Sequence, residues 1–161
     1  MTAKEKLEEG NLIQALSLYQ RYIILDDSNA QVWNNIGAIY LRMGDSQRAL
    51  AVLRKARKLD PQDPSIQVNL AIALWEEGLK EEAGKIVDEL TLRDDLNLQA
   101  TYNLLALMIR MGRRKEAYTL LKQAEAKLGT PPLLASLHPY FRDFMEKQQP
   151  EPQAGTPTAP R

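Results

Sequence analysis

The chain contains no cysteine and only one histidine, and these two scarcities exclude much of protein chemistry. Without cysteine there is no disulfide framework, no thiol nucleophile and no cysteine-ligated zinc. The single imidazole, His138, stands beside Pro139 with no acidic or nucleophilic partner near it in the sequence. We therefore expect no catalytic site, no metal and no cofactor, so an enzyme is not predicted.

Net charge and long apolar runs are also lacking. The 21 basic residues are matched by 21 acidic ones, so no overall field favours nucleic acid. No apolar run approaches the roughly 18 to 20 residues that span a bilayer, and the first ten residues have no hydrophobic signal core. We expect no nucleic-acid partner, no membrane span and a cytoplasmic location.

What the chain does have is an internal repeat. Glycine recurs at a constant interval, and alanine follows each of these glycines five places later: Gly10, Gly44, Gly78 and Gly112, then Ala15, Ala49, Ala83 and Ala117. In residues 30–63, the residues Trp33, Ile36, Gly37 and Tyr40 have the spacing of one helix face. A second apolar face follows Gly44, which can adopt the left-handed conformation that ends a helix. Each repeat is therefore predicted to be a pair of helices.

This copy resembles the tetratricopeptide repeat (TPR) at nearly every signature position: Trp33, Ile36, Gly37, Tyr40, Gly44, Ala49, Leu53, Ala56 and Pro61. The resemblance implies an all-α fold, a right-handed TPR superhelix of antiparallel helix pairs. It divides a TPR domain over 1–147 into a truncated unit, three complete units and a C-terminal capping helix: 1–29, 30–63, 64–97, 98–131 and 132–147. In the cap, we expect a turn at 133–137, then a helix from Pro139 or Tyr140 whose Phe141, Phe144 and Met145 face the array. Residues 148–161, with four prolines and no apolar anchor, are predicted to be a disordered tail.

The resemblance also implies where a ligand binds. In this family the first helix of each unit lines a concave groove through the second, fifth, sixth, ninth, twelfth and thirteenth positions of the unit. The predicted groove residues are Asn34, Asn35, Leu41, Arg42, Val68, Asn69, Ile72, Trp75, Tyr102, Asn103, Ala106, Ile109 and Arg110, and the same positions include Gln31, Ala38, Ser65, Glu76 and Gln99.

Two features of this set predict peptide binding. The sixth position is asparagine in all three complete units, Asn35, Asn69 and Asn103, and a row of side-chain amides can pair with the main chain of an extended peptide. The alternative is that these amides form bonds within the array. The neighbouring positions are apolar, and Trp75 is the best anchor for a ligand side chain. Because Arg42 and Arg110 are set against Glu76, we expect binding to depend weakly on salt.

We therefore predict a non-enzymatic scaffold that binds a protein or peptide ligand in the groove. A chaperone-tail adaptor is not expected, because the lysine and asparagine of that clamp are replaced by Asn34 and Ala38 and their equivalents. One alternative is a self-associating structural scaffold, a homodimer formed through an open N-terminal face of Tyr19, Tyr22 and Ile23. Others are a chaperone for a bacterial secretion or pilus component and a regulatory domain of a longer enzyme.

Overall fold

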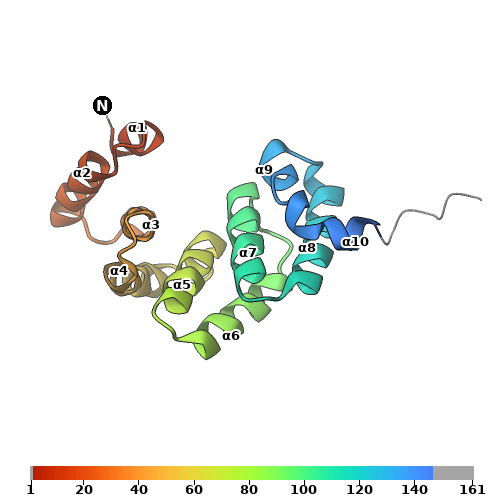
Figure 1. The fold of residues 1–161 in the computed structure, drawn as a ribbon. Coiled ribbons are helices and arrows are strands. Elements are labelled where there is room, and N and C mark those ends of the chain that lie inside the picture. The colour runs from red at the N-terminus through yellow and green to blue at the C-terminus, as the bar shows by residue number, and fades with distance from the viewer. Residues whose placement is uncertain (1, 147–161) are drawn as a thin grey trace, which may run out of the picture. The chain divides into compact units, whose positions relative to one another are not determined.

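The computed structural model describes residues 2–146, and every regular element in this range is helical (Figure 1). The predicted tail 148–161 and the last residue of the predicted cap lie outside the described residues. The elements are α1 (Ala3–Glu8), α2 (Leu12–Leu25), α3 (Ala30–Arg42), α4 (Ser46–Leu59), α5 (Pro64–Glu76), α6 (Lys80–Thr91), α7 (Leu98–Arg110), α8 (Arg114–Leu128), α9 (Pro132–Ala135), a 3₁₀ helix (His138–Phe141) and α10 (Arg142–Glu146). The chain forms two compact units, of which the first ends at Leu107 and the second begins at Met108, inside α7.

Side-chain caps decide where the first helix of each complete repeat begins. Asn29 Oδ1 accepts the backbone N–H groups of Gln31 and Val32 at 3.0 and 3.3 Å. At the same position in the next two repeats, Asp63 caps α5 at 2.9 Å and Asn97 caps α7 at 2.9 Å. A short oxygen-bearing side chain satisfies amide hydrogens that have no partner in the first turn of a helix. The register of the repeat is thus kept by the caps as well as by the glycines.

The predicted helix pairs are formed with the reversal at glycine. Gly44 has φ of 76°, a backbone conformation that favours glycine, and it lies between α3 and α4. The two helices then approach closely at Gly37, because a Cβ atom placed there would lie only 2.6 Å from Leu53 Cδ2. Leu53 is fully buried. The small residue of the first helix therefore makes room for a core leucine of the second.

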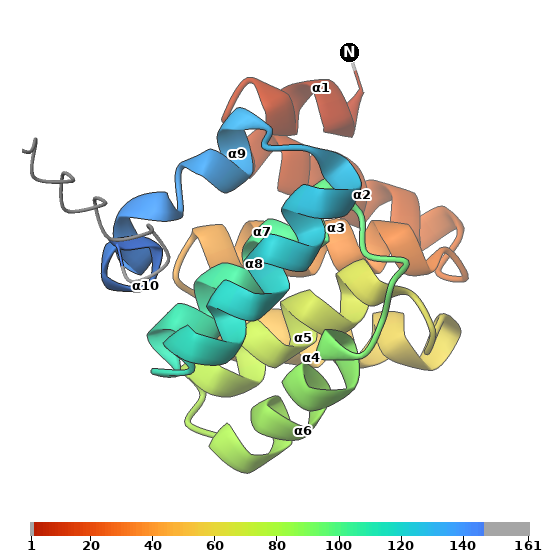
Figure 2. The ribbon, with the colours of Figure 1, turned by 90° about the vertical axis from the view of Figure 1, so that its right-hand side faces the viewer.

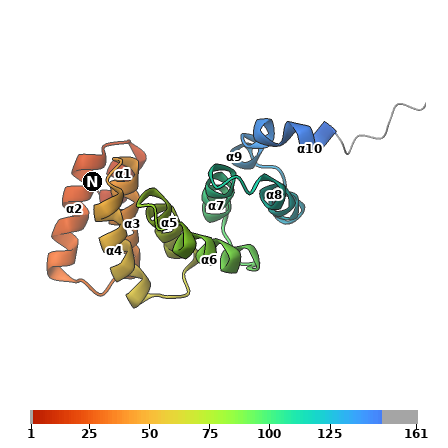
Figure 3. The same ribbon diagram turned by 60° about the horizontal axis from the view of Figure 1, so that its bottom comes forward.

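Within the first unit, each helix packs on the next, from α1 on α2 through to α5 on α6 (Figure 2). The first helices α3 and α5 are also neighbours, since α5 packs on α3 as well as on α4 (Figure 3). The interior is aliphatic, with Ile36, Leu53, Leu70, Leu74 and Leu90 almost completely inaccessible. A stacked array of this kind buries a continuous core and leaves one row of first-helix side chains facing outward.

The C-terminal segment of the second unit contains three short helices where the sequence predicted a single capping helix. Pro132 begins α9 in place of the expected turn, and Pro139 lies in the 3₁₀ helix, where the backbone N–H that it lacks is not needed. As predicted, aromatic side chains of this segment turn toward the array. Phe141 is buried against Tyr118 of α8 with ring centroids 5.6 Å apart, and Phe144 stacks on the same ring at 5.5 Å.

Candidate functional site

A groove of about 730 Å³ lies on the first unit, where the first helices of three repeats present their outer faces. Its walls are α3, α5 and the first turns of α7, and α1 contributes one residue. The lining residues are Lys4, Gln31, Asn34, Asn35, Ala38, Leu41, Arg42, Ser65, Val68, Asn69, Ile72, Asn97, Gln99, Ala100 and Asn103.

Eight of the thirteen predicted site residues line this groove: Asn34, Asn35, Leu41, Arg42, Val68, Asn69, Ile72 and Asn103. Trp75, Tyr102 and Ala106 belong to the same unit but are not among its lining residues, and Ile109 and Arg110 belong to the second unit. Trp75 is half-buried, and Lys80 Nζ lies 5.2 Å from the centre of its ring.

Sequence reasoning missed Lys4, although a signal was available. Counting back one full repeat from Ala38 reaches Lys4, so this lysine has the repeat position of Ala38 in the preceding unit. The groove positions were assigned only in the three complete units. Asn97 was missed for a different reason, because it is the cap that precedes α7 rather than a residue of the helix face.

Each of the three sixth-position asparagines, Asn35, Asn69 and Asn103, uses one end of its side-chain amide in a hydrogen bond within the array. Asn35 Nδ2 donates to the Tyr19 hydroxyl at 3.1 Å, and Asn69 Nδ2 donates to Asn34 Oδ1 at 2.9 Å. Asn103 Oδ1 accepts from Gln99 Nε2 at 3.0 Å. The bonds within the array that the sequence left as an alternative are therefore present, and the opposite end of each amide remains available.

Burial changes the interpretation of two predicted groove residues. Asn69 is 9% exposed and its partner Asn34 is 5% exposed, so the Asn69 side chain is not simply an outward-facing group. Val68 is 1% exposed, and it lies on α5, which packs against α3, α4 and α6. Although Val68 lines the groove as predicted, it has little surface to offer a ligand.

Tyr19 supports the N-terminal end of the groove as a neutral phenol. Burial raises the pKa of the Tyr19 hydroxyl above its usual value, and the hydrogen bond from Asn35 offsets only part of this effect. The side chain is 7% exposed. It therefore remains protonated at neutral pH and holds the Asn35 amide in place. The prediction that Tyr19 forms part of an open N-terminal face is wrong.

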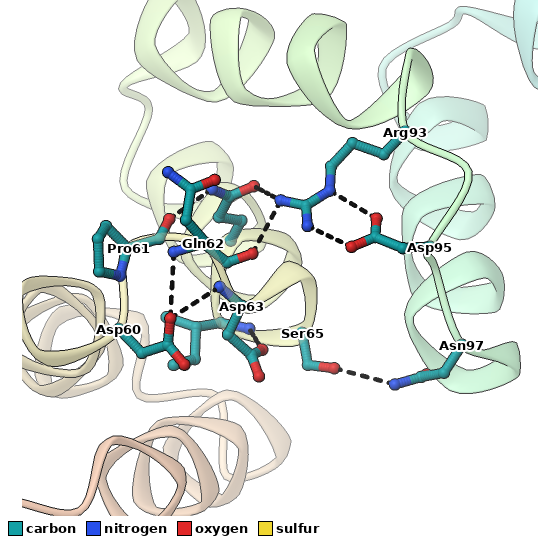
Figure 4. Close-up of polar contacts among 10 residues, drawn as sticks. Asp60, Pro61, Gln62, Asp63, Ser65, Arg93, Asp95 and Asn97 are labelled. Carbon is teal, nitrogen blue, oxygen red and sulfur yellow. Dashed lines mark hydrogen bonds and ion pairs between the residues drawn. The ribbon is translucent and has the colours of Figure 1, made fainter.

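The wall of the groove that is formed by the start of α7 is held by a polar network between two inter-repeat loops (Figure 4). The Arg93 guanidinium, in the loop before α7, donates to the Asp95 carboxylate at 2.7 and 2.5 Å and to the Gln62 carbonyl at 2.8 Å. Gln62 lies in the loop before α5. Alongside this contact, Asn97 Nδ2 donates to Ser65 Oγ at 3.3 Å, and both residues line the groove. Arg93 therefore ties the starts of α5 and α7 to each other.

The single histidine has a structural partner that the sequence did not show. His138 Nε2 lies 2.5 Å from Glu125 Oε1, which joins the C-terminal segment to α8. Among residues 2–146, no group of three or more histidine or carboxylate side chains is placed to hold a metal ion. Over the same residues, no helix is long and apolar enough to cross a membrane.

Helix pairs that repeat at a constant interval, each reversing at a glycine, define a tetratricopeptide repeat protein. The family profile described as the middle TPR-like domain of cilia and flagella-associated protein 70 matches residues 1–128. The chain belongs to this TPR family, and its all-α fold of antiparallel helix pairs agrees with the sequence prediction.

Two bacterial relatives match parts of the repeat region. The TPR repeat-containing protein PA4299 of Pseudomonas aeruginosa is 33% identical over 93 residues, which are 57% of this chain and 38% of that protein. The probable biofilm formation methyltransferase WspC of Pseudomonas putida is 42% identical over 65 residues, which are 40% of this chain and 15% of that protein. The match thus spans well under half of each of these relatives.

Solved structures share the fold at low sequence identity. The thermophilic TPR protein TTC0263 of Thermus thermophilus has a TM-score of 0.71 at 18% identity, covering 89% of this chain and 78% of that one. YrrB, described as a TPR protein with an unusual peptide-binding site, has a TM-score of 0.54 at 18% identity, covering 85% and 88%. IFIT1, in a structure with m7Gppp-AAAA, has a TM-score of 0.70 at 23% identity, covering 89% and 35%.

Proposed function

We propose that this protein is a non-enzymatic interaction module that binds an extended peptide segment of a protein partner in the groove of the first unit. The observation that carries the proposal is the groove itself, whose walls come from three successive repeats and bring seven side-chain amides together. An extended peptide exposes alternating N–H and C=O groups, and an amide can pair with either. The groove therefore offers main-chain recognition along its length.

The remaining groove surface favours a peptide over the other ligands that a TPR array could take. Leu41 and Ile72 are half-buried and line the groove, so they provide apolar contact for a ligand side chain. None of the lining residues is aromatic, whereas single-stranded nucleic acid is usually held by stacking on aromatic rings. A ligand such as the m7Gppp-AAAA of the IFIT1 structure is therefore not the one that we propose here.

The similar proteins support an interaction role without naming a partner. YrrB is described as having a peptide-binding site, PA4299 is described as a TPR repeat-containing protein, and WspC is described as a probable methyltransferase that matches over a short stretch. We propose no methyltransferase activity for this chain, since the match covers 15% of WspC. Fold likeness alone fixes neither a partner nor a reaction.

A random peptide library displayed on phage tests the proposal when it is panned on the wild-type protein and on Ala38→Trp. Ala38 lines the groove, so an indole at this position fills it. The matched control is Ala51→Trp, which places the same indole on the exposed side of α4. We expect peptides selected on the wild type to bind Ala51→Trp equally well and Ala38→Trp at least about tenfold more weakly, by fluorescence anisotropy. Equal binding to all three proteins would place the peptide site elsewhere, and failure to select any peptide would overturn the proposal.

Self-association remains the second candidate function, because the N-terminal helices expose apolar side chains. Ile24 and Leu25 are 81% and 88% exposed on α2, and Tyr22 is also exposed. These residues, rather than Tyr19 and Ile23, would form a homodimer interface. Light scattering over a range of concentrations distinguishes the two functions. A wild-type dimer that is lost in the variant Ile24→Glu/Leu25→Glu favours self-association. A wild-type protein that is already monomeric contradicts it.

A further inference from the structure

The charge of the groove differs from the charge of the molecule as a whole. The complete chain balances 21 basic against 21 acidic residues, but Lys4 and Arg42 are the only charged ones among the described residues that line the groove. Both side chains are exposed, and neither forms an ion pair with another residue in the range 2–146. Two uncompensated cations therefore lie at one cavity with no carboxylate in its lining.

Like the two cations, two of the groove amides offer a hydrogen-bond donor to a ligand. The Oδ1 atoms of Asn34 and Asn103 accept hydrogen bonds from Asn69 and Gln99, which leaves the Nδ2 group of each facing no acceptor among the described residues. Asn35 and Asn69 are reversed, since their Nδ2 groups are used and their Oδ1 atoms remain. The amides can thus still pair with both kinds of main-chain group. The Lys4 ammonium and the Arg42 guanidinium only donate hydrogen bonds, so they pair only with an anionic or acceptor group of the ligand.

We infer that the groove selects an acidic extended segment, a peptide whose aspartate or glutamate side chains lie beside Lys4 and Arg42. This inference rests on the proposed function and adds the chemical class of the ligand. Lys4 belongs to α1 and Arg42 to the last turn of α3, so the two cations come from different repeats and together mark the N-terminal end of the groove. A carboxylate near both gains from each charge and requires no rearrangement of an existing ion pair.

The salt dependence of binding should therefore be strong, contrary to the sequence-based expectation. That expectation set Arg42 and Arg110 against Glu76, but neither Arg110 nor Glu76 lines the groove. The charged residues that do line the groove, Lys4 and Arg42, are both positive. Raising NaCl from about 0.1 M to about 1 M shortens the screening length from about 10 Å to about 3 Å, and this should weaken binding of an acidic ligand.

The test uses three fluorescein-labelled, C-terminally amidated pools of mixed-sequence peptides that carry Asp, Asn or Lys at every second position. Anisotropy titrations with the full chain compare the wild type with Lys4→Gln/Arg42→Gln. The control Arg21→Gln/Lys85→Gln removes the same charge from exposed positions outside the groove. We expect the Asp pool to bind the wild type about 3- to 10-fold more tightly than the Asn pool, and the Lys pool to bind weakest.

The two double variants should then separate local from overall charge. Lys4→Gln/Arg42→Gln should remove the preference for the Asp pool over the Asn pool, while the control Arg21→Gln/Lys85→Gln keeps this preference. Equal, salt-insensitive binding of the Asp and Asn pools would overturn the inference and leave the proposed function standing. Failure of all three pools to bind would overturn both. Tighter binding of labelled oligodeoxythymidine than of the Asp pool, lost in Lys4→Gln/Arg42→Gln, would show that the two cations serve a nucleic acid instead.

Discussion

At the scale of single residues, environment decides what a given residue type does. Gly37 and Gly84 both lie inside helices, where glycine is less favourable than alanine by roughly 0.5–1 kcal/mol. A Cβ atom at Gly37 would press on Leu53, whereas a Cβ atom at Gly84 would meet nothing within 4 Å. The first glycine is required by packing, and the second is not.

Alanine at these two positions should therefore change stability in opposite directions. Gly37→Ala should lower the free energy of unfolding by about 1–3 kcal/mol, because the added Cβ atom would lie 2.6 Å from Cδ2 of the fully buried Leu53, which must shift. Gly84→Ala should raise it by about 0.5–1 kcal/mol through helix propensity alone. Urea denaturation followed by circular dichroism measures both values, and a stabilised Gly37→Ala would show that the two helices can move apart.

The Asn34–Asn69 pair shows that a groove residue can also be structural. Asn69→Ala should reduce the free energy of unfolding by about 1–3 kcal/mol, because it leaves the buried Asn34 Oδ1 without its donor. Asn103→Ala is the comparison, since its bond with Gln99 is exposed and its loss should cost less than about 0.5 kcal/mol. Equal thermal stability of Asn69→Ala and the wild type would contradict the buried pair. Any effect of Asn69→Ala on peptide affinity should accordingly be measured well below its melting temperature.

At the scale of elements, the helix pairs were predictable because several local signals agree. In residues 30–63, apolar period, glycine position and cap residues all specify the same two helices, and these are α3 and α4. The C-terminal segment was less predictable, because Pro139 excludes a regular helix interior without specifying which short elements replace it. The groove was predictable where it depends on helix faces. The groove was not predictable where it depends on how deeply each residue of a helix is buried by its neighbours, as at Val68, which is 1% exposed.

The bond between the C-terminal segment and α8 should depend on pH in the acid range. Burial by itself would raise the pKa of Glu125, but hydrogen bonds from His138 and Lys122 outweigh burial and lower it overall. A carboxyl whose pKa is lower in the folded state stabilises the fold above its unfolded pKa, and this contribution is lost as pH falls through the lowered value. The loss therefore belongs below about pH 4.5, the ordinary value for glutamate.

Glu125→Gln should remove this acid-range contribution. At pH 7 the variant should be less stable by about 1–3 kcal/mol, since the charged acceptor of His138 and Lys122 is gone. As pH falls below about 4.5, its melting temperature should decline less steeply than that of the wild type. Glu89→Gln, an equal change of charge at an exposed position of α6, should follow the wild-type curve. Parallel curves for Glu125→Gln and the wild type would show that Glu125 contributes nothing to acid sensitivity.

At the scale of the whole molecule, the two compact units provide separate reporters of unfolding. The only two tryptophans, Trp33 and Trp75, both belong to the first unit, while helices of both units contribute to circular dichroism. A repeat array is stabilised by each repeat and by its contacts with neighbours, so a weakened end can unfold before the remainder. The fluorescence and circular dichroism transitions should therefore diverge when the second unit is weakened.

Phe141→Ala is the variant that tests this separation. Phe141 is fully buried and packs on Tyr118, so its truncation should cost the second unit about 3–5 kcal/mol. We expect the circular dichroism transition in urea to broaden and begin at lower concentration, while the midpoint of tryptophan fluorescence moves by much less. Leu53→Ala is the control, because it removes a fully buried side chain of the first unit and should shift the fluorescence midpoint directly. If both signals of Phe141→Ala moved together, the chain would unfold as one cooperative block, and the division at Leu107 would have no energetic meaning.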